Sequence, residues 1–448
     1  MSIWRKGWLL ALLGQTAAAV SIWWWPGFDP PPISETKPHT LYFLAATAQS
    51  LAAILALVFT ISLVVAQLSS RYSHRMLAEF FDPLTIGYFL VFVAAALMPL
   101  WLLGQEQPLL WATRVSLTIA AAVLLLLVPY FLRFRERLDP ASVIKRLQGK
   151  AIKRLKVDRE KEPEEVAAID NFCMSAFALR DYDTFNMGVR TLGTIALEAS
   201  QDMRDTVGKG VFYRLMYIGL ATIDDPIAPV RVIVVLRDTG LQAVAHGQEA
   251  AEGWGTFPIA NIGARAAEKG LEAPAEQAVT SLIEVGREAV EHGLSVAVRV
   301  VAGLCNIAKA VIHQDARAMD RVAEGAVETL GILTAKAIEK GMKDEDTQRM
   351  VWELDWVCRK ASEGRIIDVL HAAVRRLWVI GAWATQAGAS ETIEGAWIAL
   401  RGPEEAGILP SFLQPDYVAA NESLSTDELQ QALIEFRERY SGRHGGGS

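Results

Sequence analysis

The chain has little cysteine and little charge for its 448 residues. Its three cysteines, Cys173, Cys305 and Cys358, are too few for a disulfide framework and indicate a reducing compartment for the part that carries them. Only 21% of the residues are charged and the formal net charge is −7, which argues against a general nucleic-acid binder. The 52% of hydrophobic residues excludes a disordered chain.

The sequence also lacks the motifs of common catalytic sites. It contains no His-Glu-x-x-His zinc motif, no Gly-x-Ser-x-Gly nucleophile elbow, no P-loop and no paired Cys-x-x-Cys motifs. Glu288 and His292 have the i, i+4 spacing of a metal-ligand pair, but His246 occupies the same position of another repeat, which favours a surface position. We therefore expect no enzyme, no metal site and no cofactor; a membrane-bound enzyme is the weakest of three alternatives.

Long apolar runs fill the chain up to residue 132. They cover residues 7–25, 41–68, 84–103 and 109–132. A helix needs about 20 apolar residues to cross a bilayer, so these runs predict a four-helix transmembrane domain over residues 1–132. The lysines and arginines between the runs place both termini in the cytoplasm of a bacterial inner membrane. Residues 7–25 also fit a signal peptide, although three consecutive tryptophans favour a retained helix.

One face of the second run carries mainly small and polar side chains. At helical spacing this stripe consists of Ala46, Ser50, Ala53, Leu57, Thr60, Val64 and Gln67. Two interpretations stay open: close packing of helices, or the wall of an aqueous path in an oligomer. Arg71 and Arg75 follow at the inner mouth of such a path. Arg114, on the outer side, is either a snorkelling arginine or part of an anion-selecting ring.

A basic juxtamembrane segment follows at residues 133–163. Its position predicts that Arg133, Arg135, Arg137, Lys145 and Arg146 lie near the headgroups of the lipid bilayer, where anionic lipids attract basic side chains. An ordinary solvated linker helix would have the same composition, and one segment can be both.

An internal repeat of about 47 residues occupies residues 164–400. Its copies begin at Val189, Leu236, Leu282, Leu330 and Leu377. The fifth position is small in every copy: Gly193, Gly240, Gly286, Thr334 and Gly381. This period is typical of two-helix solenoids of the HEAT or armadillo kind, so we predict a cytoplasmic α-solenoid of about five to six helix pairs. Residues 401–448 then form a connector, a C-terminal helix and a Gly-rich tail typical of an added linker.

The end of the second run carries a short signature. Ser69, Ser70, Tyr72, Ser73, Arg75 and Leu77 form a Ser-Ser-x-Tyr-Ser-x-Arg-x-Leu motif. In this respect the chain resembles a family of bacterial predicted multi-pass membrane proteins of unknown function. The resemblance implies a multi-span membrane part with a cytoplasmic domain, and it implies no activity.

Two main functions follow from an all-α chain of this organisation. The first, which we favour from sequence, is a channel-like homo-oligomer in which ions pass along the small-polar stripe and the solenoid is the vestibule or gate. The alternative is a membrane-anchored scaffold or sensor whose solenoid binds protein partners without a permeation path. Replacing Ser50, Thr60 or Gln67 with Leu should abolish permeation in the first case and only perturb packing in the second.

Overall fold

The computed structural model describes residues 37–70, 83–104, 115–127, 139–157, 162–201, 205–246, 249–292, 295–314, 319–364, 366–405, 431–436 and 438. These residues are almost entirely α-helical and contain no strand, as the all-α prediction requires. The chain forms two compact units, Met1–Arg146 and Leu147–Ser448. The boundary between them therefore falls inside helix α6 (Pro140–Val157).

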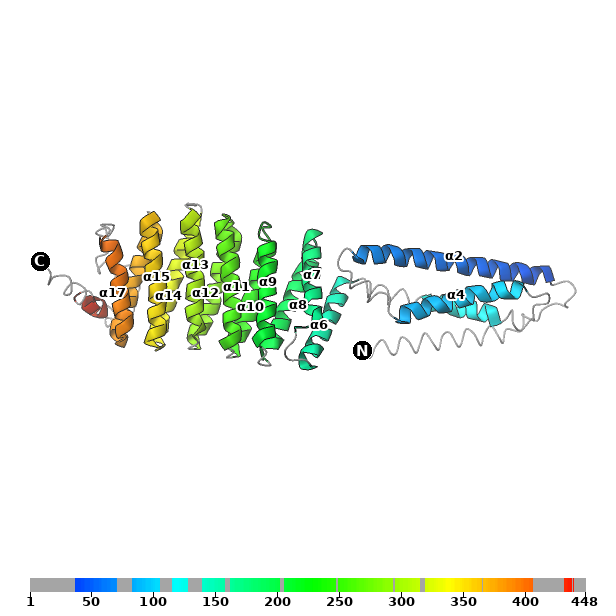
Figure 1. Ribbon diagram of the computed structural model, residues 1–448, viewed down its shortest axis with the longest axis horizontal. Coiled ribbons are helices and arrows are strands. Elements are labelled where there is room, and N and C mark those ends of the chain that lie inside the picture. The colour runs from blue at the N-terminus through cyan, green and yellow to red at the C-terminus, as the bar shows by residue number, and fades with distance from the viewer. Residues whose placement is uncertain are drawn as a thin grey trace. The chain divides into compact units, whose positions relative to one another are not determined.

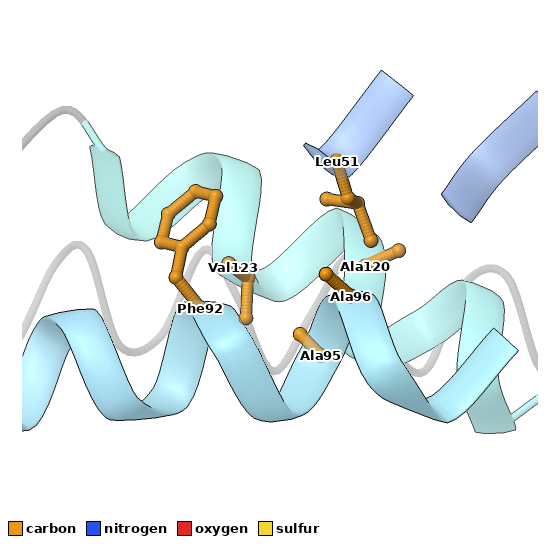
Figure 2. Packing of buried hydrophobic residues seen from close by; sticks show 6 residues of the cluster. All are labelled: Leu51, Phe92, Ala95, Ala96, Ala120 and Val123. Atoms are coloured by element: carbon orange, nitrogen blue, oxygen red, sulfur yellow. The ribbon is translucent and has the colours of Figure 1, made fainter. Parts of the chain in front are cut away.

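The first unit contains three described apolar helices, which are α2 (Lys37–Ser70), α4 (Pro83–Leu103) and Val115–Leu127. Leu51 of α2 packs against α4 and the Val115–Leu127 helix in a small buried cluster (Figure 2). The cluster consists of Leu51, Phe92, Ala95, Ala96, Ala120 and Val123. Alanines at its centre let the helix backbones approach closely, as in helix pairs packed by small residues.

Two described helices are long and apolar enough to cross a membrane, rather than the four that the sequence predicts. They are Leu44–Val64 within α2 and Ile86–Leu103 within α4. The run at 109–132 is described only over Val115–Leu127, which is too short for a span on its own. The run at 7–25 lies outside the described residues.

The second unit is an α-solenoid of two helical layers (Figure 1). The first layer contains α7 (Glu164–Ala178), α9 (Asp205–Ala221), α11 (Glu249–Glu268), α13 (Val296–Gln314), α15 (Asp344–Gly364) and α17 (Ser390–Glu405). The second layer contains α8 (Tyr182–Gln201), α10 (Ala228–Ala245), α12 (Glu272–Glu291), α14 (Asp320–Glu339) and α16 (Ile367–Ala387). Each helix contacts its chain neighbours and the next helix of its own layer. This arrangement confirms the predicted helical solenoid.

The five predicted repeat copies all fall on second-layer helices, and their small residues are where neighbouring helices meet. A side chain at Gly286 would place its Cβ 2.7 Å from Leu333 Cδ1 and 2.8 Å from Val300 Cγ1. A Cβ at Gly193 would lie 2.7 Å from Val235 Cγ1. The fifth repeat position is therefore small because the following repeat inserts a bulky side chain there.

Polar contacts between repeats also recur at one period. Lys309 Nζ lies 3.2 Å from Glu353 Oε2, and Lys269 Nζ lies 2.5 Å from Asp224 Oδ1. In the second layer Glu291 lies between Lys336 and Lys340, at 2.9 and 2.6 Å. Residues 43 to 48 positions apart therefore face each other on successive helices of a layer.

The C-terminal end of the solenoid is covered by residues 431–436, which are helical. Phe436 is fully buried there, between Trp397 of α17 and Trp378 of α16. Its ring occupies the space beside Gly381, where a Cβ would lie 2.4 Å from the ring carbon Cε1. Phe436 thus takes the place that a side chain of the following repeat takes at Gly286.

Candidate functional site

The small-polar stripe of α2 is exposed along its whole described length. Ala46, Ser50, Ala53, Leu57, Thr60, Val64 and Gln67 all face away from the buried cluster. The opposite face carries the residues that pack within the chain, among them Leu51 and Val58. The Thr60 hydroxyl donates to the carbonyl oxygen of Ala56 at 2.8 Å, so the helix itself satisfies it.

One small pocket lies between the described helices of the first unit. The pocket between α2, α4 and the Val115–Leu127 helix has a volume of about 10 Å³, room for about one water molecule. Its lining is apolar except for Tyr88: Leu55, Val58, Tyr88, Phe89, Phe92, Leu126 and Leu127. The predicted channel would run along the α2 stripe between copies of the chain, and the described helices give it no support.

The predicted charged positions divide into two groups. Arg71, Arg75, Arg114, Arg133, Arg135 and Arg137 lie outside the described residues, as do Tyr72, Ser73 and Leu77 of the signature motif. Lys145 and Arg146 are described, and both are exposed on α6.

The three cysteines are buried within the solenoid and carry no disulfide. Burial raises the pKa of the Cys173, Cys305 and Cys358 thiols, so they stay protonated and unreactive at neutral pH. The Nδ1 atoms of His246 and His292 donate to the carbonyl oxygens of Gln242 and Glu288, at 2.5 and 2.9 Å, each at the C-terminus of a second-layer helix. The described residues include no group of three side chains able to hold a metal ion.

The strongest candidate site is the exposed surface of the first layer, which the sequence did not reveal. Four large apolar side chains on helices α7 to α17 are at least half exposed, and all four lie in this layer. They are Tyr217 at 64%, Phe257 at 51%, Trp352 at 54% and Ile398 at 54%. Exposed aromatic residues gathered on one face are typical of a protein-binding surface.

Three of these side chains, those of Tyr217, Trp352 and Ile398, belong to a row that crosses five successive helices. Tyr217, Asn261, Asn306, Trp352 and Ile398 are separated by 44, 45, 46 and 46 residues, which is the separation of facing residues in this layer. We call these five residues the first-layer ridge. Asn261 is half-buried and the other four are exposed.

The centre of the first-layer ridge carries hydrogen-bonding amide side chains, and its ends carry large apolar side chains. The Asn261 amide donates one hydrogen bond from Nδ2 to the carbonyl oxygen of Phe257, at 2.8 Å. An asparagine side chain offers two donors and one acceptor oxygen, so each ridge asparagine can pair with a backbone N–H and a backbone C=O. The ridge therefore combines hydrogen-bonding groups with apolar contacts.

Aromatic side chains one helical turn away widen the ridge at both ends. Tyr213 meets Phe257 edge to face, with ring centroids 5.9 Å apart. Trp356 follows Trp352 by one turn, and Lys309 Nζ lies 4.2 Å from its ring centroid, within cation–π range. Burial lowers the pKa of Lys309, but Cys305 and the Glu353 carboxylate raise it by more, so the net pKa is raised and the ammonium group stays charged.

The sequence contained a weak signal of this ridge. The second-layer helices share small residues at their fifth repeat position. On the first layer, Ile218, Ile262 and Ile307 repeat beside the first-layer ridge at the same spacing, and so do Gly219 and Gly263. On the ridge itself, asparagine is the one repeated residue type. Exposure of the aromatic residues depends on which way each helix faces, and a period alone does not give that direction.

Comparison with known proteins gives little further guidance. No family model matches the chain, and no curated protein matches it. One similar solved structure is described as a "Circular tandem repeat protein with novel repeat topology and enhanced subunit contact surfaces". It is 13% identical and covers 90% of this chain and 94% of its own, with a TM-score of 0.37.

Proposed function

We propose that this protein is a membrane-anchored helical-repeat scaffold whose first-layer ridge binds a segment of a partner protein. The observation that carries the proposal is that the half-exposed large apolar side chains of helices α7 to α17 all lie in one layer. Solenoids commonly use such extended surfaces for binding, because each repeat adds the same kind of surface to its neighbour.

The membrane part of the proposal rests on α2 and α4. Only 22% of the apolar window in α2 and 28% of that in α4 is buried, whereas the core helix of a soluble protein is mostly buried. Leu57, Leu90 and Trp101 are each at least 60% exposed. Hydrocarbon lipid tails would cover such side chains without cost.

The finer topology belongs to the same proposal. It has four spans, both termini in the cytoplasm of a bacterial inner membrane, and several copies of the chain in one particle. Residues 7–25 and 109–132 would be the first and fourth spans. Alkaline phosphatase and fluorescent-protein fusions after residues 37, 82, 105 and 140 test the orientation, and native mass spectrometry of the solubilised particle tests the copy number.

Partner binding is tested by site-specific photocrosslinking in cells. A benzoylphenylalanine replaces Trp352 or Tyr217 on the ridge, and Arg321 on the second layer as an exposed control. We expect a discrete crosslinked protein from the two ridge positions and none from position 321. Equal crosslinking at all three positions would contradict the proposal.

A quantitative test follows once the crosslinked protein is purified. Removal of an interface tryptophan or tyrosine costs about 2 kcal/mol or more at a hot spot, which weakens binding about 30-fold. We therefore expect Trp352→Ala and Tyr217→Ala to raise the Kd by that order. The control Arg321→Ala should leave the Kd unchanged within a factor of two, and so should a variant in the α2 stripe such as Ser50→Leu.

A further inference from the structure

Helix α6 has an unusual distribution of charge. Its 18 residues include six basic side chains and no acidic one: Lys145, Arg146, Lys150, Lys153, Arg154 and Lys156. All six are exposed. The opposite face buries Val143, Ile144, Ala151 and Leu155. The helix therefore presents one continuous basic face, while its apolar face is packed within the chain.

Half of these six basic side chains have no carboxylate partner among the described residues. Arg154 Nη1 lies 3.2 Å from Glu165 Oε2 at the start of α7. Among the described residues, no acidic side chain pairs with Lys145, Lys153 or Lys156. The solenoid differs in this respect, since Lys269, Lys309 and many other basic side chains there contact carboxylates. Exposed lysines that have no carboxylate partner among the described residues favour an anionic partner from outside the chain.

The position of α6 in the chain indicates the kind of anionic partner that its basic side chains would meet. Only residues 128–139 separate it from the apolar Val115–Leu127 helix. Asp139 fixes the start of α6, because its carboxylate accepts hydrogen bonds from the Ser142 N–H at 3.1 Å and the Ser142 hydroxyl at 2.8 Å. A helix so close in sequence to an apolar helix stays within reach of any bilayer that the apolar helix enters.

We propose that the basic face of α6 lies against a bilayer and binds the headgroups of anionic lipids. This inference rests on the membrane attachment in the proposed function and is independent of the partner-binding ridge. Each basic residue near an anionic surface strengthens the attraction about fivefold at low salt. The attraction weakens as salt shortens the range of the electrostatic field.

The experiment uses the full chain in nanodiscs of phosphatidylcholine alone or with 30% phosphatidylglycerol. A fluorophore on Gly149→Cys reports the position of the basic face. Gly149 is exposed, and a Cβ there would meet no atom within 4 Å. The three native cysteines are buried and so escape brief labelling. Lipids with a headgroup-attached quencher then measure how close α6 lies to the surface.

We expect quenching in discs that contain phosphatidylglycerol, at least threefold stronger than in phosphatidylcholine alone, and its loss in 0.5 M salt. The variant Lys145→Gln/Lys153→Gln/Lys156→Gln should abolish the difference between the two lipids. The control Arg190→Gln/Arg287→Gln/Arg321→Gln removes the same charge from exposed second-layer positions and should leave it intact.

Three results would overturn the inference, and they are distinguishable. Equal quenching of the wild-type chain in both lipid compositions refutes headgroup binding by α6 alone. An undiminished difference between the two lipids in the triple glutamine variant refutes it as well. Failure of the chain to incorporate into either type of disc refutes the membrane attachment and the inference that depends on it. The photocrosslinking at Trp352 tests the ridge separately from both.

Discussion

Replacing Phe436 with Ala should loosen the C-terminal end of the solenoid and leave the rest intact. The ring is fully buried, stacks on Trp397 at a centroid distance of 5.8 Å, and meets Trp378 edge to face at 5.6 Å. It also fills the space that Gly381 leaves open on α16. Alanine would leave a cavity bordered by both tryptophans and the bare backbone of α16.

The expected cost follows from these contacts. Truncation of a buried Phe to Ala costs about 3–5 kcal/mol, and the two aromatic pairs place Phe436 well within this range. Each repeat contacts only its neighbours, so the loss falls on α16 and α17 rather than on the whole domain. A loss of about 3 kcal/mol raises the population of locally opened states more than 100-fold, since about 1.4 kcal/mol corresponds to a factor of ten.

Hydrogen–deuterium exchange measures this effect helix by helix. We expect exchange in α17 to accelerate by about two orders of magnitude in Phe436→Ala, while α9 and α11 keep their protection. The matched control is Ile434→Ala in the same segment, where the side chain is 44% exposed and its loss should cost about 0.5 kcal/mol or less. Equal exchange in the two variants, or acceleration spread evenly over α9 to α17, would refute the capping role of Phe436.

Three further predictions concern the stability of the solenoid. Gly263→Ala should destabilise the solenoid by about 1 kcal/mol or more, because the new Cβ would lie 2.5 Å from the Ala278 Cβ. Gly325→Ala should instead stabilise α14 by up to about 1 kcal/mol, because a Cβ at residue 325 would meet no atom within 4 Å. The two variants should therefore shift the Tm in opposite directions. Two lysines hold the pKa of Glu291 at about 2, so this carboxylate stabilises the fold above its unfolded pKa and the stabilisation is lost as the pH falls towards 2. Thermal melts of Glu291→Gln should therefore lie below those of the wild type at pH 7 and converge with them near pH 2. Because the three thiols are buried, a thiol reagent should react with them only after unfolding, and rapid labelling of the native solenoid at pH 8 would contradict this.

The solenoid could be predicted because its repeat is carried by residues that packing restricts. Gly286 must be small where Leu333 enters, and Gly193 and Gly381 are equally restricted by Val235 and Phe436, so the period is visible in the sequence. Gly341 and Gly388 adopt positive φ of 70° and 71° near the ends of α14 and α16, as expected for helix-terminal glycines.

The first unit was less predictable for a physical reason. Hydropathy identifies apolar runs, but lipid and protein interior are both apolar, so the pattern on α2 does not say which face meets α4. Leu51 and Val58 make those contacts, and the small-polar stripe faces outward. The capping by Phe436 was equally hidden, because no sequence period connects residue 436 with α16 and α17.

Successive repeats of the solenoid pack through similar interfaces, so the length of the solenoid can change in units of one repeat. Since successive repeats pack through corresponding positions, one whole period can be removed or duplicated while like surfaces still meet. Such a change would lengthen or shorten the first-layer ridge by one helix at a time. The length of the ridge is then set in steps of one repeat, and residues 431–436 cover the last repeat.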